Sequence, residues 1–331
     1  MATRLALVAI GALLVGCAGA RSLAPVVPES HAQVVSMTVD QKPATLDVAI
    51  HTIYVANSSA NSITEYDRSR SGNIAPLRTI AGAATGLTDP SYIAVDSLGH
   101  VFVTNATANS VTEYASRASG NATPVATLSG GVTQLSFPQG IALDANGRIY
   151  VANGASTPYI TVYRAGANGG VAPSQTIYDA IGFFSLAGMA VHGTTIYVAN
   201  TDFNFNTQVS EYPTSANGIV SPSAQIGGLN APLGVAVEGN GKIVVVDSDA
   251  IEVFAANAHG IPLPLQTIAG ARTLLNGPAG VAAGPAGIFV ADGSTPAVTS
   301  FALGANGDVA PSTDLSGAKT KLAAPIGIAI K

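Results

Sequence analysis

The sequence lacks the features that mark several large classes of protein. It has one cysteine and 10% charged residues, and no run beyond the N-terminus approaches the roughly 18 unbroken apolar residues of a membrane-spanning helix. Without a second cysteine the chain can form no internal disulfide, so packing alone must stabilise it. Its 14 Lys and Arg residues are scattered and its net charge is −5, which argues against nucleic acid or an anionic lipid surface as a partner.

The motifs of familiar catalytic sites are also missing. The sequence has no Gly-x-Ser-x-Gly elbow, no phosphate-binding glycine loop and no His-Glu-x-x-His. The histidines do not converge: His31 lies near the N-terminus, and His51, His100, His192 and His259 fall at or near predicted hairpin turns. We therefore expect no cofactor, and no catalytic residue is predicted.

Residues 1–16 have the pattern of a bacterial signal peptide. Arg4 precedes a short apolar run that is too short to span a membrane. The run ends in Leu14-Val15-Gly16-Cys17, which resembles a lipobox, where the signal is cut before a cysteine that receives a diacylglycerol. The alternative is a chance cysteine in an ordinary signal peptide. Because Cys17 is the only cysteine and lies at the cleavage point, we expect lipidation and anchoring in the cell envelope.

The residue after the cysteine and the segment that follows suggest where the anchored domain lies. Ala18, rather than Asp, is the pattern of lipoproteins sorted to the outer membrane in hosts that have one. Residues 17–42 are rich in Ala, Pro, Ser and Val and are predicted to be a flexible tether. A coil of about 25 residues spans roughly 25 to 30 Å, enough to hold a domain clear of a membrane.

One short pattern, an aromatic residue or Val inside a hydrophobic strand that ends in Asn or Asp, recurs six times. The copies are 45 to 48 residues apart and end at Asn57, Asn105, Asn153, Asn200, Asp247 and Asp292. Repeats of this length built from short strands are typical of propeller blades.

The third copy shows four strands in one repeat. Residues 138–144 and 148–153 are predicted strands joined by the turn Asn146-Gly147, and residues 160–163 form a third. An aromatic residue that we interpret as core ends each third strand: Tyr66, Tyr114, Tyr163, Tyr212, Phe254 and Phe301. A proline introduces each fourth strand, which is predicted at the outer edge, where it would block edge-to-edge pairing: Pro76, Pro124, Pro173, Pro222, Pro264 and Pro311.

The phrases "PQGIALDANGRIYVAN", "PLGVAVEGNGKIVVVD" and "PAGVAAGPAGIFVAD" resemble the NHL-repeat and related six-bladed propeller families over residues 43–331. The resemblance implies an all-β, six-bladed β-propeller of four-stranded antiparallel blades. It implies no activity, since such families include binding modules, receptor sensor domains and some enzymes. Glu65, Glu113 and Glu211 occupy a third-strand position that is Val in other copies, which we interpret as a half-exposed structural variation.

Two ways of closing the ring fit the sequence. Residues 325–330 repeat the innermost strand, although residues 46–50 already have that pattern. In one arrangement the C-terminal strand joins the first blade and closes six. In the other it pairs with residues 34–39 in an incomplete seventh blade. We favour six, because only six sets of second, third and fourth strands are present.

The Asn and Asp residues that end the second strands should lie on one face of the propeller. There the segments between blades and the loops between second and third strands emerge together. Side chains of this type usually cap turns. The alternative is a ring of oxygen ligands for a hard cation.

The fourth repeat breaks the pattern. It has the longest loop between second and third strands, residues 201–207, and the inter-blade segment before it, residues 178–185, should lie alongside. The candidate partner-binding residues are therefore Tyr178, Phe183, Phe184, Asp202, Phe203 and Phe205. The alternative is that Phe183 and Phe184 fill a gap beside Leu186 and only Phe203 and Phe205 are exposed.

The leading hypothesis is an envelope-anchored lipoprotein, monomeric, whose propeller binds a protein or extended ligand through this aromatic sector. The rival is a metal-assisted lyase or lactonase that uses Asp202, Asp247 and Asp292 with a divalent cation. A structural surface protein without a discrete ligand is a third possibility.

Overall fold

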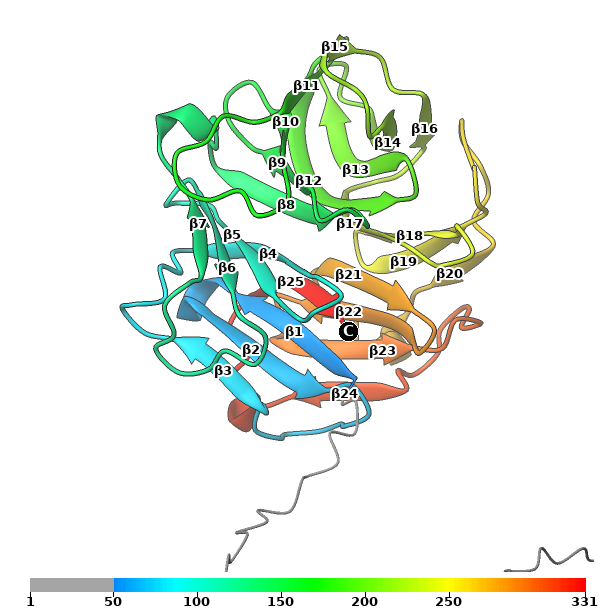
Figure 1. The fold of residues 1–331 in the computed structure, drawn as a ribbon. Helices are drawn as coiled ribbons and strands as arrows, with labels where there is room; N and C mark the ends of the chain where they lie inside the picture. The colour runs from blue at the N-terminus through cyan, green and yellow to red at the C-terminus, as the bar shows by residue number, and fades with distance from the viewer. Residues whose placement is uncertain (1–50) are drawn as a thin grey trace, which may run out of the picture. The chain divides into compact units, whose positions relative to one another are not determined.

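The structure is a computed structural model and describes residues 51–331. In this part of the chain six β-sheets are arranged around a common axis (Figure 1). The expected signal peptide, Cys17, the tether and the strand at residues 46–50 lie outside the described residues. Five sheets have four strands and the third has a fifth strand. The prediction of a six-bladed, all-β propeller is confirmed.

The first three blades have these strands, from the axis outward. The first blade contains β25 (Pro325–Ile330), β1 (Thr52–Asn57), β2 (Ser62–Asp67) and β3 (Arg78–Ala81). The second contains β4 (Pro90–Val95), β5 (Val101–Asn105), β6 (Ser110–Tyr114) and β7 (Ala126–Leu128). The third contains β8 (Pro138–Leu143), β9 (Ile149–Asn153), β10 (Tyr159–Tyr163), β11 (Gln175–Asp179) and the added β15 (Gly218–Val220).

The other three blades follow the same order. The fourth contains β12 (Phe183–His192), β13 (Thr195–Asp202), β14 (Thr207–Pro213) and β16 (Ala224–Gly227). The fifth contains β17 (Pro232–Val237), β18 (Ile243–Asp247), β19 (Ala250–Phe254) and β20 (Gln266–Ile268). The sixth contains β21 (Pro278–Gly284), β22 (Gly287–Asp292), β23 (Ala297–Phe301) and β24 (Thr313–Ser316).

Helical structure within residues 51–331 is limited to short 3-10 turns between strands. They are η1 (Ser58–Ala60), η2 (Gly131–Thr133), η3 (Ala271–Thr273) and η4 (Ala318–Thr320). No helix in this part of the chain has the length and apolar character needed to cross a membrane.

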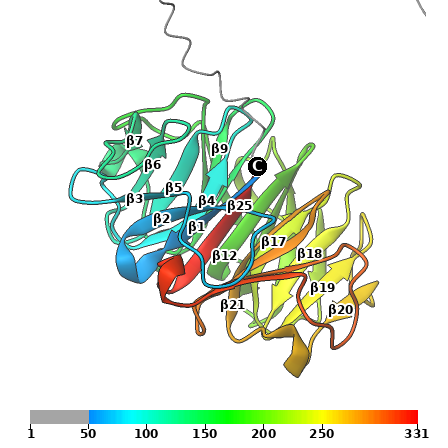
Figure 2. The ribbon, with the colours of Figure 1, turned by 90° about the horizontal axis from the view of Figure 1, so that it is seen from below.

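The C-terminal strand closes the ring by joining the first blade. β25 pairs antiparallel with β1, placing Ile53 opposite Ile330 and Val55 opposite Ile328, and the two strands lie side by side in both views (Figure 1, Figure 2). The six innermost strands then contact one another in a closed cycle. Of the two closures, the six-bladed one is therefore confirmed.

Glycine sets the spacing of the innermost strands near their first residues. In five blades a Cβ at this position would lie 2.7 Å or less from a backbone carbonyl oxygen of the next blade, at Gly140, Gly188, Gly234, Gly280 and Gly327. The second blade has Tyr92 at the equivalent position. The Tyr92 hydroxyl donates to the Leu233 carbonyl of the fifth blade at 2.9 Å, so this side chain reaches across the axis.

Backbone contacts from the next blade cover the outermost strands. The Gly120 N–H donates to the Thr79 carbonyl at 2.7 Å, and the Gly120 carbonyl accepts from Ala81. Equivalent glycines with positive φ reach the preceding blade around the whole ring: Gly72, Gly169, Gly218, Gly260 and Gly307. The repeated prolines lie two residues before each outermost strand. The edges are thus covered mainly by these glycine contacts rather than by proline.

The aromatic residues that end the third strands are buried between blades, as predicted, each with at most 1% of its surface exposed. Three of the tyrosine hydroxyls donate to the backbone carbonyl of a threonine in the segment that enters their own blade; Tyr114, for example, donates to Thr85 at 2.6 Å. Burial raises the pKa of Tyr114 to about 12.

The axial contacts predict a contrast between two glycines of the sixth blade. Gly280→Ala should lower the free energy of unfolding by about 1–3 kcal/mol, because the new methyl group overlaps the Ile326 carbonyl oxygen. Gly304→Ala is the control, since nothing lies within 4 Å of its added Cβ. Urea denaturation measures both variants. Equal stability of the two would show that the axis is not packed this closely.

Candidate ligand-binding face

The face at which the inter-blade segments enter the innermost strands, here called the entry face, carries the predicted site residues. The Asn and Asp residues that end the second strands are all buried there. The Asn105 amide nitrogen donates to the Thr112 hydroxyl at 3.1 Å, and its oxygen accepts from the Thr88 N–H at 3.1 Å. These side chains join the second and third strands to the segment that enters the blade.

The three aspartates of the predicted metal site make similar local hydrogen bonds. Asp247 accepts from the backbone N–H groups of Asn230 and Ala231 at 2.9 and 2.6 Å. Asp292 accepts from the backbone of two residues in its own blade, and Asp202 accepts from Asn204 and Asn206. Within residues 51–331 no three His, Cys, Asp or Glu side chains gather as metal ligands. The aspartates thus fit loop fixation better than metal binding.

The first two strands of the fourth blade are longer at the entry face than the sequence predicted. β13 continues to Asp202 and pairs with β12 back to Phe183, so much of both predicted loops is strand. A tight turn follows, in which Phe205 has φ +62 and its N–H donates to the Asp202 carbonyl at 2.9 Å. Asp202 is buried and fixes this turn.

Because Phe183 and Phe184 are neighbours in a strand, they lie on opposite sides of it. Phe183 is 1% exposed and packs edge-on against Tyr212, with ring centroids 5.9 Å apart. Phe184 is 52% exposed. The structure therefore places Phe183 in the core, as one alternative expected, and Phe184 on the surface.

Three phenylalanines form an exposed cluster, here called the phenylalanine triad: Phe184, Phe203 and Phe205. The ring centroids of Phe184 and Phe203 are 6.3 Å apart and those of Phe184 and Phe205 are 5.2 Å apart. Phe203 is 49% exposed and Phe205 is 71% exposed. Tyr178 is not part of the triad. It lies in β11 of the third blade, with its ring 5.4 Å from that of Tyr159.

The segment that enters the fourth blade is fixed by an aspartate. In the first three blades a threonine carbonyl accepts the tyrosine hydroxyl of the third strand, but here the Asp179 carboxylate accepts from Tyr212 at 2.6 Å. The other carboxylate oxygen accepts from the N–H groups of Ile181 and Gly182. Burial, together with the nearby Asp179, raises the pKa of Tyr212. This role of Asp179 was not predicted from the sequence.

A pocket of about 400 Å³ opens at the centre of the entry face and extends toward the fourth and fifth blades. Every blade contributes at least one residue from its innermost strand to this channel-mouth pocket, among them Tyr92, Gln139, Ala187, Leu233, Ala279 and Ile326. Ser185, Thr201 and Thr207 line it on the fourth blade, and along the chain Ser185 follows Phe184 and Thr201 is two residues from Phe203. The three phenylalanines themselves do not line the pocket. Its volume lies at the lower end of the range for small-molecule sites.

Charged groups are scarce around the pocket and the triad. None of the 15 lining residues is Asp, Glu, Lys, Arg or His. Residues 129–137, 154–158, 180–182, 203–206 and 228–231, which connect strands at this face in the third and fourth blades and enter the fifth, contain none either, whereas the connection between the second and third strands of the fifth blade carries Asp249. The nearby Asp179 and Asp202 are buried and hydrogen-bonded. The described surface in this sector is thus apolar and neutral polar.

The pocket residues were not predicted from the sequence. The side chains of Gln139, Ser185 and Thr201 make no hydrogen bond to any described residue, which leaves their donors and acceptors available. A signal existed only for Tyr92, which interrupts an otherwise constant glycine position. Strand pairing and ring closure bring the other residues together from distant parts of the chain.

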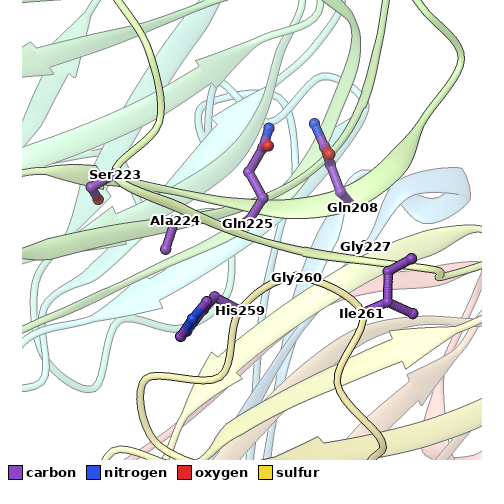
Figure 3. Close-up of a pocket in the computed structure, with 8 residues that line it drawn as sticks. All are labelled: Gln208, Ser223, Ala224, Gln225, Gly227, His259, Gly260 and Ile261. Carbon is purple, nitrogen blue, oxygen red and sulfur yellow. The ribbon is translucent and has the colours of Figure 1, made fainter.

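A second cavity, of about 480 Å³, lies at the outer rim between the fourth and fifth blades (Figure 3). It is lined by the outermost strand β16 and by His259, Gly260 and Ile261 of the next blade. The exposed His259 ring contacts the Asn257 carbonyl at 3.1 Å. This cavity lies apart from all the predicted site residues.

Comparisons with known proteins agree on the fold. The structure is similar to a chain of a nidogen/laminin complex, with a TM-score of 0.60 and 15% identity over 85% of this chain and 98% of that chain. It is also similar to a protein of unknown function from Bacteroides caccae (TM-score 0.56, 10% identity, 85% and 98% covered) and to the WD40 propeller domain of Doa1 (0.52, 10%, 80% and 79%). No family model and no curated protein matches the sequence. At these identities the likeness shows the β-propeller fold alone.

The three glutamates of the third strands have unequal surroundings. Glu65 and Glu211 are buried, not half-exposed as expected, whereas Glu113 is half-buried. Each pairs with the outermost strand of its blade, Glu65 opposite Arg78 and Glu211 opposite Ala224. Arg78 on that strand donates to both oxygens of Glu65, at 2.8 and 2.9 Å. The equivalent residue opposite Glu211 is Ala224, and the Glu211 Oε1 has no partner among the described residues. Burial raises the pKa of Glu211 above its ordinary value.

This difference predicts opposite effects of the same substitution. A raised carboxyl pKa means that stability present at low pH is lost as the pH rises through the raised value. Glu211→Gln should therefore raise the melting temperature at pH 7 and change it little at pH 4. Glu65→Gln should lower it at pH 7, because Arg78 loses its partner. Thermal melts at both pH values measure this, and a lower melting temperature of Glu211→Gln at pH 7 would contradict it.

Proposed function

We propose that this protein is a binding module that holds an extended ligand on the entry face. The observation that carries the proposal is the phenylalanine triad beside the channel-mouth pocket. Exposed aromatic clusters next to a concave surface are typical of recognition sites, where a few such side chains provide most of the binding energy.

These phenylalanines have no counterpart in the other repeats, although the Phe203 ring packs on Gly182. The other blades connect their second and third strands without a phenylalanine in the turn, and the core of the fourth blade is filled by Phe183, Leu186 and Tyr212. Phe203 and Phe205 stand on a turn that Asp202 holds in one conformation. A fixed turn lowers the entropy cost of ordering the rings when a ligand binds.

The cell envelope is the proposed location. The lipobox-like sequence at Cys17 and the tether that follows support a lipoprotein, in the outer membrane if the host has one. We propose that it is monomeric. The proposed ligand is neither nucleic acid nor an anionic lipid, since this sector of the entry face carries no Lys or Arg.

Photocrosslinking of the full-length chain in native envelopes tests the site. We expect benzoylphenylalanine in place of Phe203 to form an adduct. Phe184→Ala with Phe205→Ala should reduce its yield by about tenfold or more, because truncating an anchor residue costs about 2 kcal/mol. Benzoylphenylalanine in place of Leu274, which is similarly exposed at 52% in the segment entering the sixth blade, is the control. Equal adducts at both positions, or none at Phe203, would reject the site.

A further inference from the structure

We propose that the ligand of the entry face is a neutral glycan, bound with one part in the channel-mouth pocket and the next part along the phenylalanine triad. The inference rests on the proposed function and names the chemistry of its ligand.

The free polar groups of the pocket match the chemistry of sugar hydroxyls. Gln139 offers an amide, and Ser185 and Thr201 offer hydroxyls, so each side chain can both donate and accept a hydrogen bond. None of the three is used within the described chain. A sugar hydroxyl also donates and accepts, whereas a carboxylate, phosphate or ammonium ligand would lose its hydration without gaining an opposite charge.

Aromatic rings provide the complementary apolar contacts. The negative face of an aromatic ring attracts the weakly positive C–H groups that cover one side of a sugar ring. Tyr92 supplies a ring inside the pocket. Its hydroxyl is held by the Leu233 carbonyl at 2.9 Å, and a Cβ on Gly188 would lie 3.1 Å from its Cε1. This packing fixes the ring, and the triad continues the aromatic surface outside the pocket.

The absence of charge favours a glycan over a protein partner. About a quarter of the residues in an average protein are charged, so the rim of a protein-binding surface usually offers some charged residues. The pocket lining contains none, and neither do the connections of the third and fourth blades beside it, although Asp249 lies on the connection of the fifth blade. A neutral polysaccharide needs no charged side chain for binding. Its extended shape fits a site in which the phenylalanine triad continues from the pocket.

Tyr92 is inferred to determine specificity. The equivalent residue in the other five blades is glycine, which the close strand packing requires. Only the second blade projects a side chain there, and that side chain crosses to the fifth blade. It gives the pocket an aromatic wall that the repeat alone would not provide.

The test is binding of the purified full-length chain to defined probes, measured by calorimetry after an array screen. The probes are neutral cello-, malto- and chito-oligosaccharides, acidic oligogalacturonate, and a library of uncharged peptides. We expect a neutral oligosaccharide to bind with an affinity that barely changes between 50 and 500 mM NaCl, because no charge is neutralised. Phe203→Ala and Gln139→Ala should each weaken binding about tenfold or more, and Leu274→Ala should leave it unchanged.

A second pair of variants isolates Tyr92. Tyr92→Phe keeps the ring and should retain most of the affinity, whereas Tyr92→Ala should remove most of it. Circular dichroism and melting of each variant separate loss of the ring contact from loss of the fold.

The outcomes distinguish the two proposals. If only peptides or oligogalacturonate bind, and binding depends on Phe203, the glycan is rejected and the binding site stands. If neutral glycans bind equally well to the Phe203→Ala variant, the assignment of the glycan to this face is rejected. If no probe binds and Phe203 forms no crosslink in envelopes, both proposals fail.

Discussion

The close approach of the innermost strands is the contact on which the rest of this propeller depends. At five of six positions only a hydrogen can occupy the space between a glycine Cα and a carbonyl oxygen of the next blade. Since each blade meets the next in this way, the angle between neighbouring sheets is set near the axis. The buried tyrosines and phenylalanines fill the space further out. Six blades complete the ring when β25 takes the innermost place beside β1.

At the outer edge of the propeller, neighbouring blades are joined by backbone hydrogen bonds. An outermost strand normally leaves a row of unpaired N–H and C=O groups, which invites pairing with another chain. Here the next blade supplies a glycine that bonds to that edge, and in the fourth blade the contact grows into the short parallel strand β15 beside β11. The Asn and Asp residues that end the second strands make equivalent connections on the entry face. Backbone polar groups at the blade boundaries thereby find partners mostly in other backbone groups and in asparagine side chains, with Asp247 and Asp292 in two blades, which is consistent with a chain that is only 10% charged.

The repeated features could be predicted from the sequence, and the departures from the repeat only in part. The period and the third-strand aromatics follow from one pattern that each copy repeats. The closure with six blades was only favoured, because two closures fitted the sequence until the pairing of β25 with β1 decided between them. The burial of Phe183 and the exposure of Phe184 could not be predicted. Adjacent side chains point to opposite sides only in a strand, and the sequence of residues 178–185 resembled a loop. The burial of Glu211 depended on strand register in the same way. Gln139, Ser185 and Thr201 carry no local signal at all, since a pocket built by all six blades exists only after closure.

The candidate site and the stability of the ring use different residues, and this separation explains how one blade can depart from the pattern. In the fourth blade Phe183 and Tyr212 fill the core, and Asp179 replaces the threonine carbonyl that other blades use. The extension that carries Phe203 and Phe205 begins beyond these contacts. Substituting the triad therefore leaves the interior of the blade intact, although Phe184 and Phe203 are about half-buried. Adding one methyl group at an axial glycine, by contrast, disturbs two blades at once. Because the axial glycines and the buried aromatic residues hold the blades together, the exposed rings can change without a change of fold. The chemistry of the entry face can therefore vary on the same scaffold.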